Sequence, residues 1–168
     1  MKIRKSEKGN IVVGSIIIVG IILIILMFII TVFMENINSI LYGIKTDMYM
    51  INKAAVLSVN KNKANVDNYT YNEKEYKKEF LNLLKRNYEL NDDLKSNNGI
   101  ISKIEIKEYK LYKIGQKDSY TKQKCDDVVI HTVLKVNVRP IILKDTLEDL
   151  FVFTVHEDVN LNMVKLKR

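Results

Sequence analysis

The hydrophobic positions of the chain begin with one long apolar run, over residues 11–34. The run holds no charged side chain, and 18 of its 24 residues are Ile, Val, Leu or Phe. As a helix it would be about 36 Å long at about 1.5 Å per residue, and crossing the hydrocarbon core of a membrane takes about 20 such residues. Its apolar side chains favour insertion by at most about 5 to 11 kcal/mol. The pattern therefore predicts a transmembrane helix.

Beyond the run, apolar side chains recur at intervals of three or four residues, which describes one face of an amphipathic helix. This apolar stripe consists of Ile37, Leu41, Ile44, Met48, Ile51 and Ala55. It predicts that the helix extends outside the membrane over residues 35–59, either continuously or with a kink at Gly43. The stripe is a candidate helix-packing interface, and it must pack on the chain's own globular domain, on neighbouring copies, or on both.

A second helix is predicted after a polar loop over residues 60–68, because apolar and aromatic side chains then repeat at every fourth position. They are Tyr76, Phe80, Leu84 and Tyr88. Thr70 and Glu73 have the spacing of an N-terminal capping box. We expect the helix to end within the polar residues 91–99.

The period then changes from four residues to two, which indicates β-strands. Ile104 and Ile106 alternate with charged residues, but Tyr109 and Leu111 follow in the opposite phase. Such a change of phase within one strand requires an extra residue. We therefore predict a β-bulge near Lys107–Glu108.

Two further strand patterns follow a polar loop over residues 115–127. The clearest alternation covers residues 128–139 and ends at Pro140. Another runs over residues 151–163, and a break at Glu157–Asp158 leaves open whether it forms one strand or two. The sequence thus predicts an antiparallel meander of three or four strands, with one face packed on the helices and the other facing water.

These elements together predict an α+β fold: a single N-terminal transmembrane helix extended into a long amphipathic helix, a second helix, and the meander sheet. Along the chain we expect a cytoplasmic basic leader at residues 1–10 and the transmembrane helix at 11–34. The helical extension follows at residues 35–59, and a small extracytoplasmic α+β domain at 60–168.

Charge on the two sides of the apolar run predicts its orientation in the cell membrane. The leader carries four basic residues and one acid: Lys2, Arg4, Lys5, Lys8 and Glu7. The twenty residues after the run carry only two basic residues, Lys45 and Lys53, so the positive-inside rule places the N-terminus in the cytoplasm and residues 35–168 outside. A cleaved secretory signal is the alternative, but its apolar core would be shorter and an A-x-A-like cleavage site would follow it.

Composition argues against several classes of function. The formal net charge is +7, but outside the membrane basic and acidic residues are interleaved, so we predict no binding of nucleic acid. The single cysteine, Cys125, excludes an intramolecular disulfide. The sequence has no G-x-S-x-G, no H-E-x-x-H and no glycine-rich phosphate loop. We therefore predict no enzyme activity, no catalytic or cofactor-binding residues, no cofactor and no small-molecule substrate.

The two histidines, His131 and His156, fall on neighbouring predicted strands and should lie close together. Without a defined third ligand they make a weak metal site, so we predict no metal ligands and favour surface or strand-filling histidines. Acidic pairs at residues 92–93, 126–127 and 157–158 lie in predicted loops or strand breaks. Turn and solvated-loop chemistry explains these pairs.

The junction between the basic leader and the apolar run has a recognisable form. Lys8-Gly9 is followed by Asn10-Ile11-Val12-Val13 and the long Ile/Val/Leu helix. With a small outer α+β domain, and with a C-terminal stretch VLKVNVRPIILKD that loosely matches the family's sheet, the chain resembles the TadE-like minor pseudopilins of tight-adherence pili. The resemblance implies cleavage between Gly9 and Asn10 by a prepilin peptidase. Family members usually carry a Glu five residues after the cut, where this chain has Gly14.

Two classes of function follow from these features. The first is a non-enzymatic pilin-like membrane protein, a subunit or assembly factor of a bacterial surface pilus or secretion apparatus. Its partners would be the lipid bilayer and other pilin-like or envelope proteins, and self-association is left open. The second is a single-pass membrane scaffold or secretion-system component with an extracytoplasmic binding domain. Removal of residues 1–9 would favour the first class, and an intact N-terminus the second.

Overall fold

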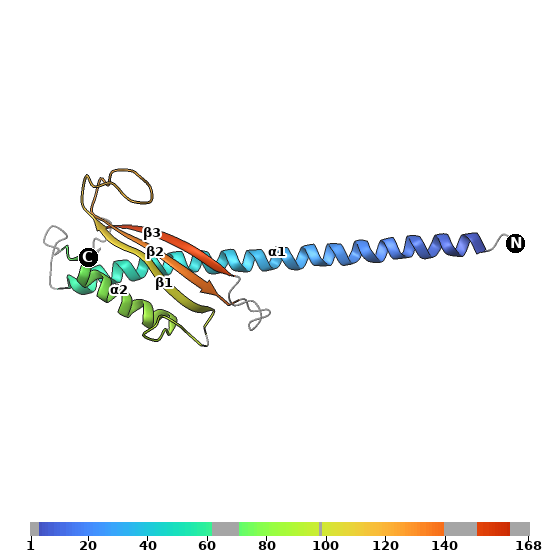
Figure 1. The fold of residues 1–168 in the computed structure, drawn as a ribbon, viewed down its shortest axis with the longest axis horizontal. Coiled ribbons are helices and arrows are strands. Elements are labelled where there is room, and N and C mark those ends of the chain that lie inside the picture. Colours follow the sequence, from blue (N-terminus) through green and yellow to red (C-terminus); the bar gives the residue numbers. More distant parts are fainter. Residues whose placement is uncertain (1–3, 62–70, 98, 140–150, 162–168) are drawn as a thin grey trace. The chain divides into compact units, whose positions relative to one another are not determined.

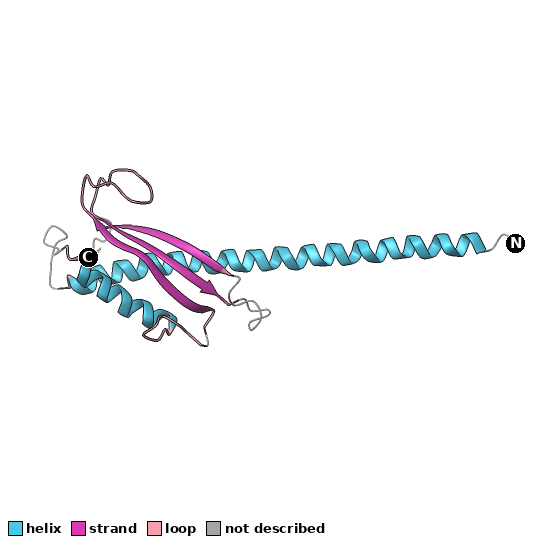
Figure 2. Ribbon diagram, in the orientation of Figure 1, coloured by secondary structure: helices cyan, strands magenta, loops and turns pink. Residues whose placement is uncertain are grey.

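The computed structural model describes residues 4–61, 71–97, 99–139 and 151–161 (Figure 1). The elements in chain order are α1 (Arg4–Val59), α2 (Glu73–Tyr88), β1 (Ile101–Tyr112), β2 (Val129–Val138) and β3 (Val152–Asn160). Figure 2 shows the helices in cyan and the strands in magenta. The predicted α+β class, with a long N-terminal apolar helix followed by a helix and an antiparallel sheet, is confirmed.

Contacts within the chain divide it into an N-terminal unit, Met1–Ile40, and a C-terminal unit, Leu41–Arg168. In the N-terminal unit, large apolar side chains are exposed at successive positions, as at Ile16, Ile17 and Ile18. Because a helix turns once in 3.6 residues, such a run is apolar and exposed on every face. Within the described residues, α1 is the helix long and apolar enough, by length and composition, to cross a membrane.

The sheet of the C-terminal unit has the order β1-β2-β3, and both pairs of neighbouring strands are antiparallel. Successive side chains of a strand point to opposite faces. On the inner face, Thr132 of β2 exchanges hydrogen bonds with Asn52 of α1, at 3.1 and 3.4 Å. Tyr109 of β1 packs on Phe80 of α2, with ring centroids 5.1 Å apart. This face therefore packs on α2 and on residues 41–59 of α1.

The predicted β-bulge in β1 is confirmed. Ile106 pairs with Leu134, whereas Glu108 pairs with the next residue, Val133, so that Lys107 is the extra residue. The insertion puts Tyr109 on the inner face and Glu108 on the outer face, where a regular strand would have done the reverse.

The apolar stripe is largely covered by the chain's own C-terminal unit. Ile44, Met48, Ile51 and Ala55 are all buried, and Leu41 is half-buried. Of the partners that the sequence left open, the chain's own globular part accounts for these four residues. Ile37 lies in the N-terminal unit. The helix continues through Gly43 without a break, and its residues 41–59 belong to the C-terminal unit.

Both predicted ends of the second helix need correction. The N-cap is Asn72, whose side chain accepts hydrogen bonds from the backbone N–H groups of Lys74 and Glu75, while Thr70 lies outside the described residues. Glu73 is the first residue of the helix, and its Oε2 accepts the backbone N–H of Leu111 on β1 at 2.9 Å.

The helix ends at Tyr88, before the predicted residues 91–99. Glu89 takes up the left-handed conformation, with φ 51°, and its N–H reaches the carbonyl of Lys85. This closes the last turn. The position at which the helix ends depends on the backbone conformation of Glu89, which neither the apolar period nor the composition predicts.

The sequence left open whether the chain forms one strand or two at Glu157–Asp158, and the structure shows one continuous strand there. Both residues pair with β2, Glu157 opposite Thr132 and Asp158 opposite His131. Acidic side chains interrupt the apolar alternation here because they have partners on β2 and α1. The backbone pairing of β3 with β2 continues through both residues. A fourth strand would include residue 163, which lies outside the described residues.

Candidate functional site

The predicted leader cleavage residues, Gly9 and Asn10, lie within α1. The stripe residues predicted to form an interface serve mainly as the core described above. Outside these, the most distinctive gathering of chemically active side chains is on the outer face of the sheet. It combines His131 of β2 with His156 and Asp158 of β3.

Strand register explains why these side chains meet. His131 lies directly opposite Asp158 in the antiparallel pairing of β2 and β3. His156 precedes Asp158 by two residues, so both point to the same face of the sheet. Glu108, placed on this face by the β-bulge, approaches from the other side on β1, with Oε2 3.7 Å from Nε2 of His131.

The loop between β1 and β2 adds a further carboxylate, that of Asp118. Backbone hydrogen bonds join the two sides of this loop, from Gly115 to Cys125 and from Cys125 to Gln116, both at 2.8 Å. The glycine has φ +80°, a conformation that other residues rarely adopt. The loop thereby carries Asp118 to the outer face, with Oδ2 3.3 Å from Nδ1 of His131.

The carboxylate of Asp118 is held by the turn that follows it. Its Oδ1 accepts hydrogen bonds from the backbone N–H groups of Tyr120, at 2.6 Å, and Thr121, at 2.7 Å. Burial raises the pKa of Asp118, but these hydrogen bonds and the nearby His131 outweigh it and leave the pKa below its ordinary value. The group is therefore a fixed anion whose second oxygen, Oδ2, faces the histidine.

Three side-chain atoms lie close together, one each from His131, His156 and Asp158. Nδ1 of His131 lies 2.8 Å from Oδ1 of Asp158 and 3.2 Å from Nε2 of His156. Nε2 of His156 is also 3.2 Å from Oδ1 of Asp158. We call His131, His156, Asp118 and Asp158 the histidine–aspartate cluster.

Aromatic rings close around the cluster. Tyr120 stacks on His156, with centroids 4.1 Å apart and ring planes at 19°. Tyr112 meets His131 edge-on at 5.7 Å and accepts the backbone N–H of Ser119 with its hydroxyl. As a result the side chain of His131 is completely buried, and water is kept from its ring.

Sequence reasoning found part of this cluster. It placed the two histidines on neighbouring strands and close together, and their ring centroids are 4.7 Å apart. It missed Asp158, because the Glu157–Asp158 pair was interpreted as a strand break. The signal that was available is the spacing of His156 and Asp158, two residues apart on one strand. Asp118 had no signal, because it lies in a loop without periodicity.

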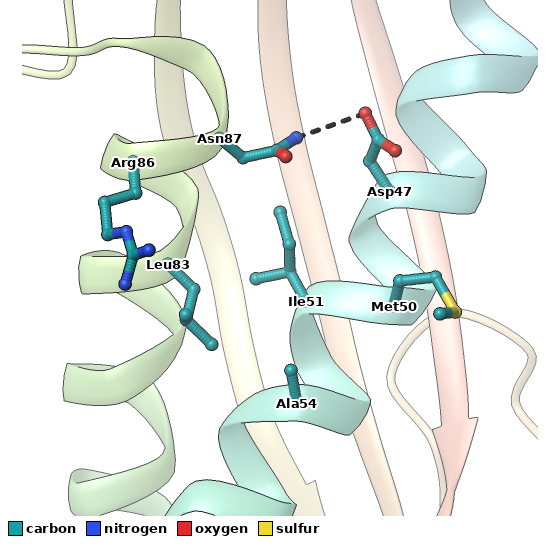
Figure 3. A pocket seen from close by; sticks show the side chains of 7 residues that line it. All are labelled: Asp47, Met50, Ile51, Ala54, Leu83, Arg86 and Asn87. Atoms are coloured by element: carbon teal, nitrogen blue, oxygen red, sulfur yellow. Dashed lines mark hydrogen bonds between the residues drawn. The ribbon is translucent and has the colours of Figure 1, made fainter.

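A second surface feature lies between the helices of the C-terminal unit. Figure 3 shows the groove and its lining residues, Asp47, Met50, Ile51 and Ala54 of α1 and Leu83, Arg86 and Asn87 of α2. The Asn87 amide donates a hydrogen bond to Asp47 across the groove at 3.2 Å. Burial and the hydrogen bond to Asp47 raise the pKa of Tyr88 far above its ordinary value. These contacts of Asp47 with Asn87 and Tyr88 join the two helices.

Comparison with known proteins gives no match. No family model, no curated protein and no solved structure matches this chain.

Proposed function

We propose that this chain is a non-enzymatic, pilin-like membrane protein that serves as a subunit or assembly factor of a bacterial surface pilus or secretion apparatus. The observation that carries the proposal is helix α1. It is apolar and exposed on every face over the span, and it continues without a break into the core of a small α+β unit. The same succession of parts carries the resemblance to TadE-like pseudopilins.

The physical reason for a membrane location is the cost of exposing the span to water. Ile24, Met27 and Phe28 are each about two-thirds exposed, at 69, 70 and 68%. Burial of apolar surface stabilises by about 25 cal/mol per Å², and lipid supplies that burial where the chain does not. The hydroxyl of Thr31 is also compatible with lipid, because it donates a hydrogen bond to the carbonyl of Met27 within the helix. The basic leader favours a cytoplasmic N-terminus, with the C-terminal unit outside.

Contacts between subunits would then involve the span more than the apolar stripe. Four stripe residues are already buried inside the C-terminal unit and offer little surface to a neighbour. Residues 12–34 keep their side chains largely exposed. Gly14, at the position where family members usually carry a Glu, offers no carboxylate to a neighbouring N-terminal amine. Packing of apolar helices in lipid is therefore the proposed contact.

The absence of that Glu favours a second candidate, a single-pass scaffold or secretion-system component that keeps its leader. In that case the C-terminal unit would bind envelope proteins outside the membrane, and residues 1–9 would stay in the cytoplasm. The two candidates differ in one covalent property, the presence or absence of the leader.

Processing by a prepilin peptidase tests the proposal directly. We expect the membrane-bound chain to lose residues 1–9 in cells that contain the peptidase and to keep them in cells that lack it. Intact-mass spectrometry of the detergent-extracted protein measures this. Gly9→Leu is the matched control, since it should keep its leader in both strains. Full-length wild-type protein in both strains would overturn the pilin-like proposal and leave the scaffold.

A further inference from the structure

We propose that the histidine–aspartate cluster is a binding site for one divalent transition-metal ion of the zinc class. Three ligands are Nδ1 of His131, Nε2 of His156 and Oδ1 of Asp158. The fourth would be Oδ2 of Asp118, which lies 3.3 Å from Nδ1 of His131 and would move toward the other two ligands as the ion binds. This inference concerns the outer face of the sheet alone and does not depend on the proposed membrane function.

Distances within the cluster support this assignment. Zinc lies about 2.0 to 2.2 Å from nitrogen and oxygen ligands, and in a tetrahedral site the ligand atoms are about 3.3 to 3.6 Å apart. His156 Nε2 lies 3.2 Å from each of its two neighbours in the cluster, and the contact between His131 and Asp118 is 3.3 Å. The contact between His131 and Asp158, at 2.8 Å, would lengthen by about half an ångström around an ion.

Proton counting shows why a cation fits better than a neutral hydrogen-bonded network. A neutral imidazole has one N–H donor and one acceptor nitrogen. If the proton of His131 is on Nδ1, it satisfies one of two facing aspartates, and the lone pair of Nε2 faces Glu108. If the proton is on Nε2, the lone pair of Nδ1 faces both carboxylates. Either neutral tautomer leaves a repulsion, which a metal ion at Nδ1 or a second proton on the ring would remove.

A metal ion removes both conflicts at once. Nδ1 of His131 would bind the ion, and the proton would be on Nε2. That nitrogen is buried without a hydrogen-bond partner and lies 3.7 Å from the carboxylate of Glu108. Ligating histidines almost always donate their second N–H to a carboxylate, carbonyl or water. Glu108 therefore has the place of an outer-shell positioning residue.

Charge and donor type define the ion. The ring of His131 is approached by three carboxylates, those of Asp118, Asp158 and Glu108, whose charge a divalent cation would offset. Imidazole nitrogens favour zinc and its transition-metal neighbours, whereas calcium and magnesium take oxygen ligands. With Asp118 as the fourth ligand no open position would remain, which is typical of a structural site. The ion would thus fasten the loop carrying Asp118 to strands β2 and β3.

Zinc titration of the untagged full-length chain in detergent, after removal of metal with a chelator, tests the site. We expect one zinc per chain by calorimetry and elemental analysis, together with a rise in Tm. Cobalt(II) should give the intense visible absorption of a tetrahedral site. His156→Ala and Asp158→Asn should each weaken zinc binding by more than about 100-fold, because loss of even an outer-shell partner costs about 10- to 100-fold.

Asp126→Asn is the matched control. It removes the same charge from an exposed residue of the same loop, and it should bind zinc as the wild type does. Less than one zinc per chain at saturation, or equal affinity in the wild type and both cluster variants, would overturn the proposal. The first result would also follow if a protonated His131 replaced the metal. The cobalt spectrum of the wild type decides the question even if a variant folds poorly.

Discussion

The double substitution Ile22→Arg/Ile24→Arg should remove the chain from the membrane. Both positions lie near the middle of the span, and both side chains are exposed, so the change disturbs no packing within the chain. Each arginine at the centre of a transmembrane helix costs about 2.5 to 3.5 kcal/mol, and each lost isoleucine removes a further 0.3 to 0.6 kcal/mol, roughly 6 to 8 kcal/mol for the pair. That change is comparable to the whole insertion free energy of about 5 to 11 kcal/mol, itself an upper bound.

Membrane flotation after alkaline extraction measures this effect. The wild-type chain should float with the lipid, whereas most of the double variant should stay in the soluble or aggregated fraction. Tyr42→Arg/Met50→Arg is the control, because it adds the same charge to exposed positions of α1 beyond the span. If the variant and the control float equally well, the apolar run is not the membrane anchor.

Met48→Asp should unfold the C-terminal unit while leaving the anchor in the membrane. Met48 is completely buried where α1 forms the core. Loss of a buried methionine side chain costs about 2 to 5 kcal/mol, and burial of an unpaired carboxylate costs more. A small domain is stable by about 5 to 15 kcal/mol in total. We therefore expect the variant to lose cooperative thermal unfolding and to be cut rapidly by protease outside the span.

Met50→Asp makes the comparison sharp, because it introduces the same residue only two positions away. Met50 is 57% exposed and lines the surface groove between α1 and α2 (Figure 3). Surface substitutions usually change stability by about 0.5 kcal/mol or less, so its Tm should stay close to the wild-type value. A Met48→Asp variant as stable and as protease-resistant as Met50→Asp would show that the stripe is not a core.

The parts of the fold that the sequence predicted are those that produce a periodic pattern of apolar residues within one element. The apolar run, the four-residue repeat of α2 and the alternation of the strands are each complete within one element. The β-bulge was predicted for the same reason, because the change of phase between Ile106 and Tyr109 occurs along a single strand. The period of the apolar residues shows which face of an element is apolar. That information was enough to predict the class of the fold.

What the sequence could not predict depends on contacts between distant residues. The stripe could have packed on another subunit or on its own domain, and only the contacts of β2 with α1, such as Thr132 with Asn52, decide for the latter. Helix ends depend on single backbone conformations, such as that of Glu89. In the cluster, a loop places Asp118 beside His131. The conformation of a loop produces no periodic pattern in the sequence.

The central claim is that α1 anchors a folded unit on the outer side of the cell membrane. It is tested most directly by cysteine labelling in spheroplasts of a strain without prepilin peptidase, so that the leader is retained. In a Cys125→Ser background, one variant carries Lys78→Cys, on an exposed position of α2, and the other carries Ser6→Cys, in the leader. A membrane-impermeant maleimide should label residue 78 in intact spheroplasts and residue 6 only after lysis. Labelling of residue 6 but not residue 78 before lysis would contradict the account.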